Sequence, residues 1–305
     1  MADFQYNIEI GDYIADAVNY VNTNWVPVLD GISSFIGFIV DGLEGLLLAM
    51  PPLLLAAVLV VLGLWRVSWR FAITVAVFMF LIIGMNLWEE TVSTLAVVVA
   101  SSAIAIVIGM PIGIAMSKND WLQATLRPVL DLMQTMPPFV YLIPAAMFFG
   151  LGKVPGSIAT LVFAMPPIVR LTNLGIRQVS VENVEAGIAF GCTDGQLLRK
   201  VQLPLAMPSV MAGVNQTIML ALSMVVIASM IGAGGLGSTV LTGIQRLNVG
   251  LGFEGGLGVV FLAIILDRIT QSFGLSERER GEDLVTRAVR ALMGRRHDQE
   301  EASSA

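Results

Sequence analysis

The chain has 305 residues, of which 56% are hydrophobic and 13% charged, and its net charge is −6. In soluble domains roughly a quarter of all residues are charged. This composition therefore excludes an ordinary soluble domain and indicates an integral membrane protein surrounded by lipid. The acidic balance argues against a nucleic-acid partner. Long apolar runs favour spanning helices over a barrel of alternating strands. We therefore expect an all-α, polytopic membrane fold.

The first 50 residues contain acidic side chains but no lysine or arginine. Apolar residues recur there at helical spacing, as at Ile10, Ile14, Val18 and Val21. This pattern is typical of a helix that lies on a membrane surface. We predict an acidic, external amphipathic arm over residues 1–50, and a loosely ordered arm is the alternative.

A transmembrane domain is predicted over residues 51–275. A spanning helix needs about 20 mostly apolar residues. We predict about seven spans, and five or six are also compatible because the first and fifth apolar runs are short. The runs lie at 51–65, 71–88, 91–116, 132–151, 155–170, 209–231 and 255–273.

The basic residues set the orientation of these spans. With seven spans, all of the 17 lysines and arginines except Lys153 and Arg246 fall on one side, which the positive-inside rule makes cytoplasmic. We therefore expect the N-terminus outside and residues 276–305 as a cytoplasmic tail. Ser276 and Glu279 form a capping-box pattern in that tail, which predicts a short surface helix followed by disorder.

A polar island at residues 181–204 interrupts the apolar runs and predicts two short helices. Gly191 ends the first helix, because glycine enters the left-handed conformation without a Cβ clash. Residues 193–196, Thr-Asp-Gly-Gln, form a capping box that begins the second, and Pro204 is expected to break it. The apolar face of the first helix is formed by Val181, Val184 and Ile188.

This bent, one-sidedly apolar segment suits two roles that the residues alone leave open. It can insert into a partner protein, or it can lie flat on the lipid surface. A further pattern within it is Glu185-Ala186-Gly187, followed by Gly191 and then by Leu203-Pro204. This pattern resembles the EAA loop of permease subunits of binding-protein-dependent ABC importers, with glycine in place of the second alanine.

The resemblance implies that residues 171–208 form a cytoplasmic coupling loop that docks on an ABC ATPase subunit. The implied docking residues are Glu185, Ala186, Gly187, Gly191, Leu203 and Pro204. ATP and Mg²⁺ would be bound by that partner. This chain has no phosphate-binding G-x-x-x-x-G-K-[ST] motif, one cysteine and one histidine, so we predict no catalytic site, no metal site and no cofactor of its own.

A longer part, from about Leu87 to Asn248, resembles the permease subunits of glycine betaine/proline betaine (ProU-type) importers. The similar stretches are residues 135–145, 149–156, 165–177 and 230–237. The resemblance implies a type I ABC importer transmembrane domain, which works as a homodimer in the bacterial inner membrane. It also implies an external substrate-binding protein, and a solute of the glycine betaine, proline betaine or choline type.

Polar and proline residues within the apolar runs are candidates for lining a solute pathway, because polar groups inside a membrane tend to face the helix bundle. Two simpler alternatives remain open. The prolines can mark helix starts and kinks, and the polar side chains can bond neighbouring helices. The candidates are Met136, Pro137, Tyr141, Asn215, Gln216, Ser223 and Met224.

Residues 232–237 fit G-x-G-x-x-G by letter. A dinucleotide site needs a strand before this motif, whereas a membrane span precedes it here, so we expect a flexible turn at the external mouth. A stand-alone secondary carrier or channel is the alternative function. It would require an intramembrane ion site or an inverted repeat, and the recurring Met-Pro-Pro at 50–52, 136–138 and 165–167 is only a weak sign of repetition. A purely structural scaffold is the third class.

Overall fold

The computed structural model describes residues 10–274, and the tail predicted at 276–305 lies outside the described residues. Every regular element in the described part is a helix, which confirms the all-α prediction. In chain order these are α1 (Ile10–Asn24), α2 (Val26–Leu48), α3 (Pro52–Arg66), α4 (Trp69–Gly84), α5 (Trp88–Lys118), α6 (Asp120–Thr135), α7 (Pro138–Phe149), α8 (Lys153–Arg177), α9 (Val181–Ala189), α10 (Asp194–Leu197), the π-helix η1 (Leu198–Gln202), α11 (Leu203–Ala228), the 3-10 helix η2 (Ser229–Ile231), α12 (Gly235–Gln245) and α13 (Val249–Gly274).

Five helices between residues 10 and 274 are long and apolar enough to cross a membrane: α2, α5, α8, the continuous helix Asp194–Ile231 and α13. The pair α6 and α7 adds a sixth candidate, which is bent by 99° at a short break. Met136 and Pro137 lie at this break in extended conformations. The count of five to six falls within the range that the sequence predicted.

The first two predicted spans are short helices, as the sequence indicated for the first of them. Helices α3 and α4 have 15 and 16 residues, so each is about 22–24 Å long, less than the ~30 Å hydrocarbon core. Ser68 separates them and caps α4, because its Oγ accepts from the Phe71 N–H at 3.2 Å. The two helices form a hairpin that packs against α13 through residues such as Val75, Met79 and Ile265.

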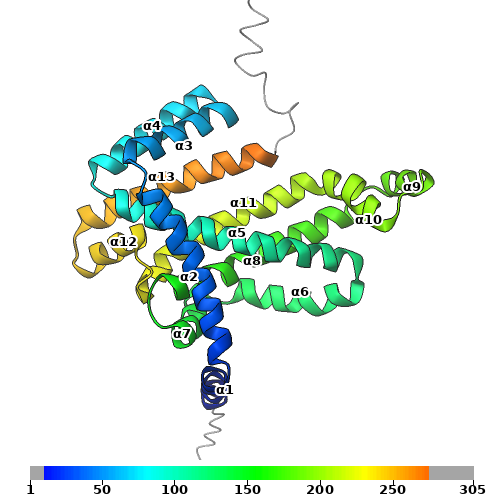
Figure 1. Cartoon of the computed structure of the whole chain (residues 1–305), viewed down its shortest axis with the longest axis horizontal. Helices are drawn as coiled ribbons and strands as arrows, with labels where there is room; N and C mark the ends of the chain where they lie inside the picture. The colour runs from blue at the N-terminus through cyan, green and yellow to red at the C-terminus, as the bar shows by residue number, and fades with distance from the viewer. Residues whose placement is uncertain (1–9, 275–305) are drawn as a thin grey trace, which may run out of the picture.

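The predicted arm contains α1 and α2. Helix α2 is a candidate span by length and composition, yet Figure 1 shows it crossing α5 and α8 steeply instead of running along them. Its buried stripe contains Ile36, Val40 and Glu44. Glu44 Oε2 lies 2.5 Å from Nζ of Lys153, at the start of α8. This ion pair fixes α2 to the bundle, and the division of the chain at residue 50 stays a prediction.

The centre of the molecule is the contact of α8 with α5 and α11, which run side by side in Figure 1. Small residues allow these backbones to approach closely, as is common between membrane helices. A Cβ on Gly113 of α5 would lie 2.6 Å from the Val169 carbonyl oxygen. A Cβ on Gly213 of α11 would lie 3.1 Å from Cα of Ile168. Close packing at these positions makes α5, α8 and α11 the rigid core.

Helix α8 is longer than predicted. The fifth apolar run was expected to end at Arg170, but the helix begins at Lys153 and continues to Arg177. Pro166 and Pro167 remain inside it and are buried. Arg170 therefore lies within a candidate span, about 10 Å before its end.

The glycine-rich segment at 232–237, which the sequence predicts to be a flexible turn, makes close contacts with neighbouring helices. Gly232, Gly234 and Gly235 have positive φ angles of 84°, 78° and 68°. A Cβ on Gly237 would lie 2.7 Å from the Val225 carbonyl oxygen. The Leu236 N–H donates to Oγ1 of Thr94 at 2.8 Å. The segment thus joins α11 and α12 to α5, and no strand precedes it within the described residues.

Candidate functional site

The polar island folds as the sequence predicted up to its second helix. Helix α9 ends at Ala189, and Gly191 follows with φ of 78°. The capping box is present: the Thr193 side chain accepts from the backbone of Gln196, and the Thr193 N–H donates to Oε1 of Gln196 at 3.0 Å. These contacts fix a sharp turn between α9 and α10. Figure 1 shows both helices at one end of the molecule, beyond the ends of α6 and α8.

The tip of this loop exposes apolar side chains. Phe190 is 90% exposed, Val181 is 65% exposed and Ile188 is 58% exposed. Isolated apolar residues are normal on surfaces, but a contiguous apolar patch marks an interaction site. The sequence analysis missed Phe190, although an aromatic residue directly before the glycine that ends a helix is a usable signal. The tip, defined as Val181, Ile188 and Phe190, is suited to enter a groove on a partner.

The inner side of the same loop is closely packed at Gly187. This residue is buried, and a Cβ on it would lie 2.7 Å from Cδ1 of Leu197. The glycine in place of the second alanine of the EAA pattern therefore brings α9 close to the helix that follows. Glu185 and Ala186 are exposed beside it, as are Gly191 and Pro204, and Leu203 is half-buried. Four of the six predicted docking residues are thus accessible.

The prediction that Pro204 breaks the second helix is wrong. Residues Asp194–Ile231 form one continuous helix of 38 residues. A π-helical turn at Leu198–Gln202 precedes the proline, and the Leu203 N–H bonds to the Leu198 carbonyl. A proline in an α-helix lacks a donor and clashes with the carbonyl four residues earlier. The wider π-turn provides room for the proline ring. Helix α10 of the loop and the span α11 are therefore parts of one continuous helix.

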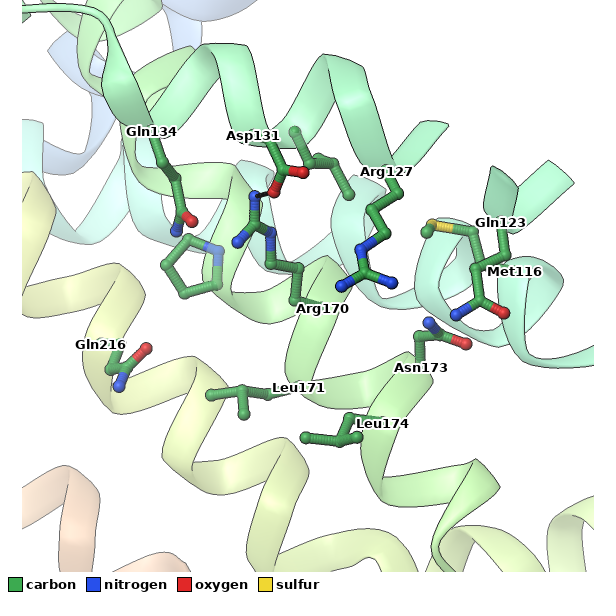
Figure 2. Close-up of a pocket in the computed structure, with 12 residues that line it drawn as sticks. Met116, Gln123, Arg127, Asp131, Gln134, Arg170, Leu171, Asn173, Leu174 and Gln216 are labelled. Carbon is green, nitrogen blue, oxygen red and sulfur yellow. Dashed lines mark hydrogen bonds and ion pairs between the residues drawn. The ribbon is translucent and has the colours of Figure 1, made fainter. Parts of the chain in front are cut away.

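A cavity of about 430 Å³ lies between α6, α8 and α11, on the side of the bundle that carries the loop. Figure 2 shows Arg127, Asp131 and Gln134 of α6 pointing toward Arg170 of α8, with Gln216 of α11 at the edge. Leu171 and Leu174 contribute apolar walls. The remaining lining residues are Met116, Gln123, Leu130, Pro167 and Asn173.

The charged part of this cavity contains two arginines and one aspartate. The Arg170 Nη2 forms an ion pair with Oδ1 of Asp131. Sequence analysis did not select these residues, although a regular signal was present. Gln123, Arg127, Asp131 and Gln134 recur at intervals of three and four, so they share one face of α6. The apolar face of α6 packs on α5 and α8 through residues such as Leu130 and Met133, and the exposed polar face lies at the edge of this contact, where it lines the cavity.

Two of the predicted pathway residues, Gln216 and Ser223, lie on an exposed stripe of α11 that also contains Ala212 and Met219. Gln216 lines both the cavity described above and a second one beside α13. The Ser223 hydroxyl donates to the Met219 carbonyl at 3.0 Å. A membrane helix rarely exposes a glutamine to lipid, so this stripe suits a water-filled path or a second protein surface.

Other predicted pathway residues have mainly structural contacts. Asn215 donates to Oδ1 of Asp267 at 3.0 Å and accepts from Thr270 at 2.8 Å. These bonds join α11 to α13, which agrees with the alternative that polar side chains bond neighbouring helices. Its side chain also lines the second cavity.

Met224 is fully buried in a cluster with Leu142 and Ala159, so it does not line an open path in this structure. The Tyr141 hydroxyl donates to the Met133 carbonyl at 2.5 Å across the break between α6 and α7. Met136 and Pro137 form that break, which supports the interpretation of these residues as a kink.

Solved structures support the fold. Two structures of the inward-facing MetNI methionine ABC transporter match with TM-scores of 0.53 and 0.52, at 25% and 24% identity. The first covers 67% of this chain and 95% of the matched chain, and the second covers 65% and 93%. This similarity confirms a type I importer architecture for the described helices.

Sequence relatives and a family model agree with the fold. Glycine betaine/proline betaine permease ProW of Escherichia coli is 47% identical over 90% of this chain and 77% of its own length. Glycine betaine/carnitine permease GbuB of Listeria monocytogenes is 50% identical over 82% of this chain and 94% of its own length. Glycine betaine permease OpuAB of Bacillus subtilis is 44% identical over 90% of this chain and 97% of its own length. The model of the binding-protein-dependent transport system inner membrane component matches residues 105–274. The chain therefore belongs to this family, the permease subunits of ABC importers.

Proposed function

We propose that this chain forms the translocation pathway for a quaternary ammonium solute of the glycine betaine, proline betaine or choline type. The names of relatives that are 44–50% identical support this class of solute. Family membership makes the chain a transport subunit that works with an ATPase and a substrate-binding protein, and it replaces the alternative of a stand-alone carrier.

The exposed apolar tip of the coupling loop is the observation that supports docking on the ATPase. Helix α9 lies at one end of the molecule (Figure 1), and Val181, Ile188 and Phe190 are exposed there. Burying them in a groove would gain about 25 cal/mol for each Å² removed from water. Glu185 lies beside the tip and adds a charge to the contact. ATP and Mg²⁺ are bound by the partner ATPase, whose closure moves this loop.

The proposed assembly contains two copies of the chain in a bacterial inner membrane, with the N-terminus outside and the C-terminus in the cytoplasm. The exposed stripe of α11 supports a second copy, because Gln216 and Ser223 gain a polar or aqueous surface when two such stripes face one another. The loop side of the bundle also carries Lys118, Arg177 and Arg199, in keeping with a cytoplasmic face.

The docking proposal is tested by purifying the tagged chain from its native membrane and measuring the amount of ATPase that co-elutes. We expect an about equal amount with the wild type and a large loss with Phe190→Asp, because a charge at the centre of a buried apolar contact is costly. Glu185→Lys and Gly191→Trp should also reduce co-elution and ATP-driven uptake while the chain still inserts.

Leu247→Asp is the matched control, because Leu247 is 89% exposed between α12 and α13, at the opposite end of the continuous helix. This variant should retain the ATPase. If Phe190→Asp retains as much ATPase as Leu247→Asp, the tip is not the docking surface.

The solute is tested by uptake into proteoliposomes that contain the chain, its ATPase and its binding protein. Labelled glycine betaine should accumulate only with ATP, and excess proline betaine should compete with it. Accumulation without ATP, or no uptake of any quaternary ammonium solute, would contradict the proposed function.

A further inference from the structure

The cavity between α6, α8 and α11 holds more positive than negative charge. Arg127 and Arg170 contribute two guanidinium groups, and Asp131 contributes one carboxylate. Asp131 is used by Arg170, whereas Arg127 forms no ion pair with any described residue. Arg127 is therefore available for a ligand.

Arg170 forms an ion pair but keeps one hydrogen-bond donor without a partner. Its Nη2 pairs with Asp131, while its Nε is buried and has no hydrogen-bond partner among the described residues. A buried donor without a partner costs free energy, and an acceptor that enters the cavity would remove this cost. Both arginines line the cavity: in Figure 2 the Arg170 guanidinium is turned toward Asp131 of α6, and the Arg127 guanidinium is turned toward α8 near Asn173.

The rest of the lining limits the ligand to a small, partly apolar molecule. Gln123, Gln134 and Gln216 provide neutral amides at the edges, and Leu171 and Leu174 provide apolar walls. A volume of about 430 Å³ lies within the range of small-molecule sites. Arg170 lies within the candidate span α8, where charged side chains are costly and mark solute pathways.

We infer that this cavity is a solute site of the permease itself, in which Arg127 binds the carboxylate of a small zwitterion. The inference rests on the proposed function and narrows it. Guanidinium groups bind carboxylates through paired, charge-assisted hydrogen bonds. Glycine betaine and proline betaine carry a carboxylate, whereas choline does not, so the cavity favours the betaines over choline.

The cavity is also connected to the coupling loop through two helices. Gln216 at its edge belongs to the continuous helix that begins in the coupling loop. Arg170 belongs to α8, which leads into the other side of the same loop. Movement of the loop therefore changes both walls of the cavity.

The test measures ligand protection in the solubilised complex, without ATP and without binding protein. Cys192, the only cysteine, is replaced by serine, and a reporter cysteine is introduced as Gln123→Cys or, separately, Gln134→Cys. We expect glycine betaine to slow the reaction of both reporters with N-ethylmaleimide, and choline at the same concentration to have no such effect.

Arg127→Gln in the reporter chains should weaken the protection by about ten- to a hundredfold, as expected for the loss of a hydrogen bond to a charged group. Arg127→Lys should have an intermediate effect, because it keeps the charge and loses the planar fork. Arg268→Gln removes one charge from an exposed position of α13 outside the cavity and should leave the protection unchanged.

Equal protection by choline, no protection by glycine betaine, or full protection in Arg127→Gln would overturn the inference. Protection by inorganic phosphate or phosphatidylglycerol but not by glycine betaine would also overturn it, since the cavity would then be an anion or lipid site. Wild-type uptake tests the proposed function separately, because protection requires no transport.

Discussion

Two glycine turns lie at the two ends of the continuous helix Asp194–Ile231, and their surroundings differ. Gly191 precedes the helix and Gly232 follows it, with similar φ angles of 78° and 84°. A Cβ on Gly191 would meet nothing within 4 Å, whereas a Cβ on Gly237, just beyond the outer turn, would meet backbone atoms of α11.

This difference separates two reasons for using glycine. The outer segment needs glycine for two reasons: Gly232, Gly234 and Gly235 have positive φ angles, and at Gly237 the backbones touch, so the segment joins α11 and α12 to α5. The inner turn needs glycine only for its backbone conformation, and the space around it is open. The open space around Gly191, beside the exposed side chain of Phe190, leaves room for another protein to bind.

The largest effect is expected at the packed turn. Gly237→Val places side-chain atoms where Val225 O and Val226 Cα lie 2.7 and 2.9 Å from the new Cβ. Overpacking typically costs about 1–3 kcal/mol and occasionally more, and a clash with backbone atoms cannot be relieved by a side-chain rotation, so the thermal midpoint of the purified chain should fall strongly. Gly256→Val in α13 is the control, because its Cβ would meet nothing within 4 Å. Equal midpoints for both variants would remove the distinction between the turns.

A smaller effect is expected from the hydrogen bond that holds the outer turn. Thr94→Val leaves the buried N–H of Leu236 without its acceptor, which should cost about 1–3 kcal/mol. Thr91→Val is the control, because its hydroxyl donates only to the Leu87 carbonyl, which already accepts from the Thr91 N–H. Chemical denaturation of the two variants measures the difference, and equal loss of stability would show that the outer turn does not depend on this bond.

The smallest change in stability is expected at the inner turn, where transport should nevertheless be sensitive. Asparagine tolerates a left-handed backbone and valine does not. We therefore expect Gly191→Asn to retain uptake and ATPase binding, and Gly191→Val to lose both, with a change of about 1–2 kcal/mol or less in the free energy of unfolding. Normal uptake by Gly191→Val would show that the turn geometry is not required for coupling.

The sequence predicted the turn between α9 and α10 well because its signals are local. A helix-ending glycine and a capping box act within a few residues, so Gly191 and Thr193 could be placed without tertiary information. Pro204 was misjudged because a π-turn in the preceding residues changes the usual consequence of a proline. That turn cannot be recognised from the residue pattern alone.

Longer-range features were harder to predict. Helix α8 continues beyond Arg170 to Arg177, and Arg170 pairs with Asp131 on another helix, a contact that the pattern of the apolar run does not show. The sequence did not predict α2 as a spanning helix, because its acidic residues are typical of a surface segment. Its contact with the bundle includes the ion pair of Glu44 with Lys153, which is distant in the sequence. The cavity brings together three helices, and only the polar face of α6 was visible in the sequence.

The continuous helix has a consequence for how force passes through the molecule. From Asp194 to Gln216 the helix extends over about 33 Å, with no break between the docking loop and the cavity. The departure from α-helical geometry along this length is the π-turn at Leu198–Gln202, directly beside the loop, and Leu203 to Gln216 is regular α-helix. In the proposed complex, a displacement of the loop by the ATPase would therefore reach Gln216 through an unbroken helix.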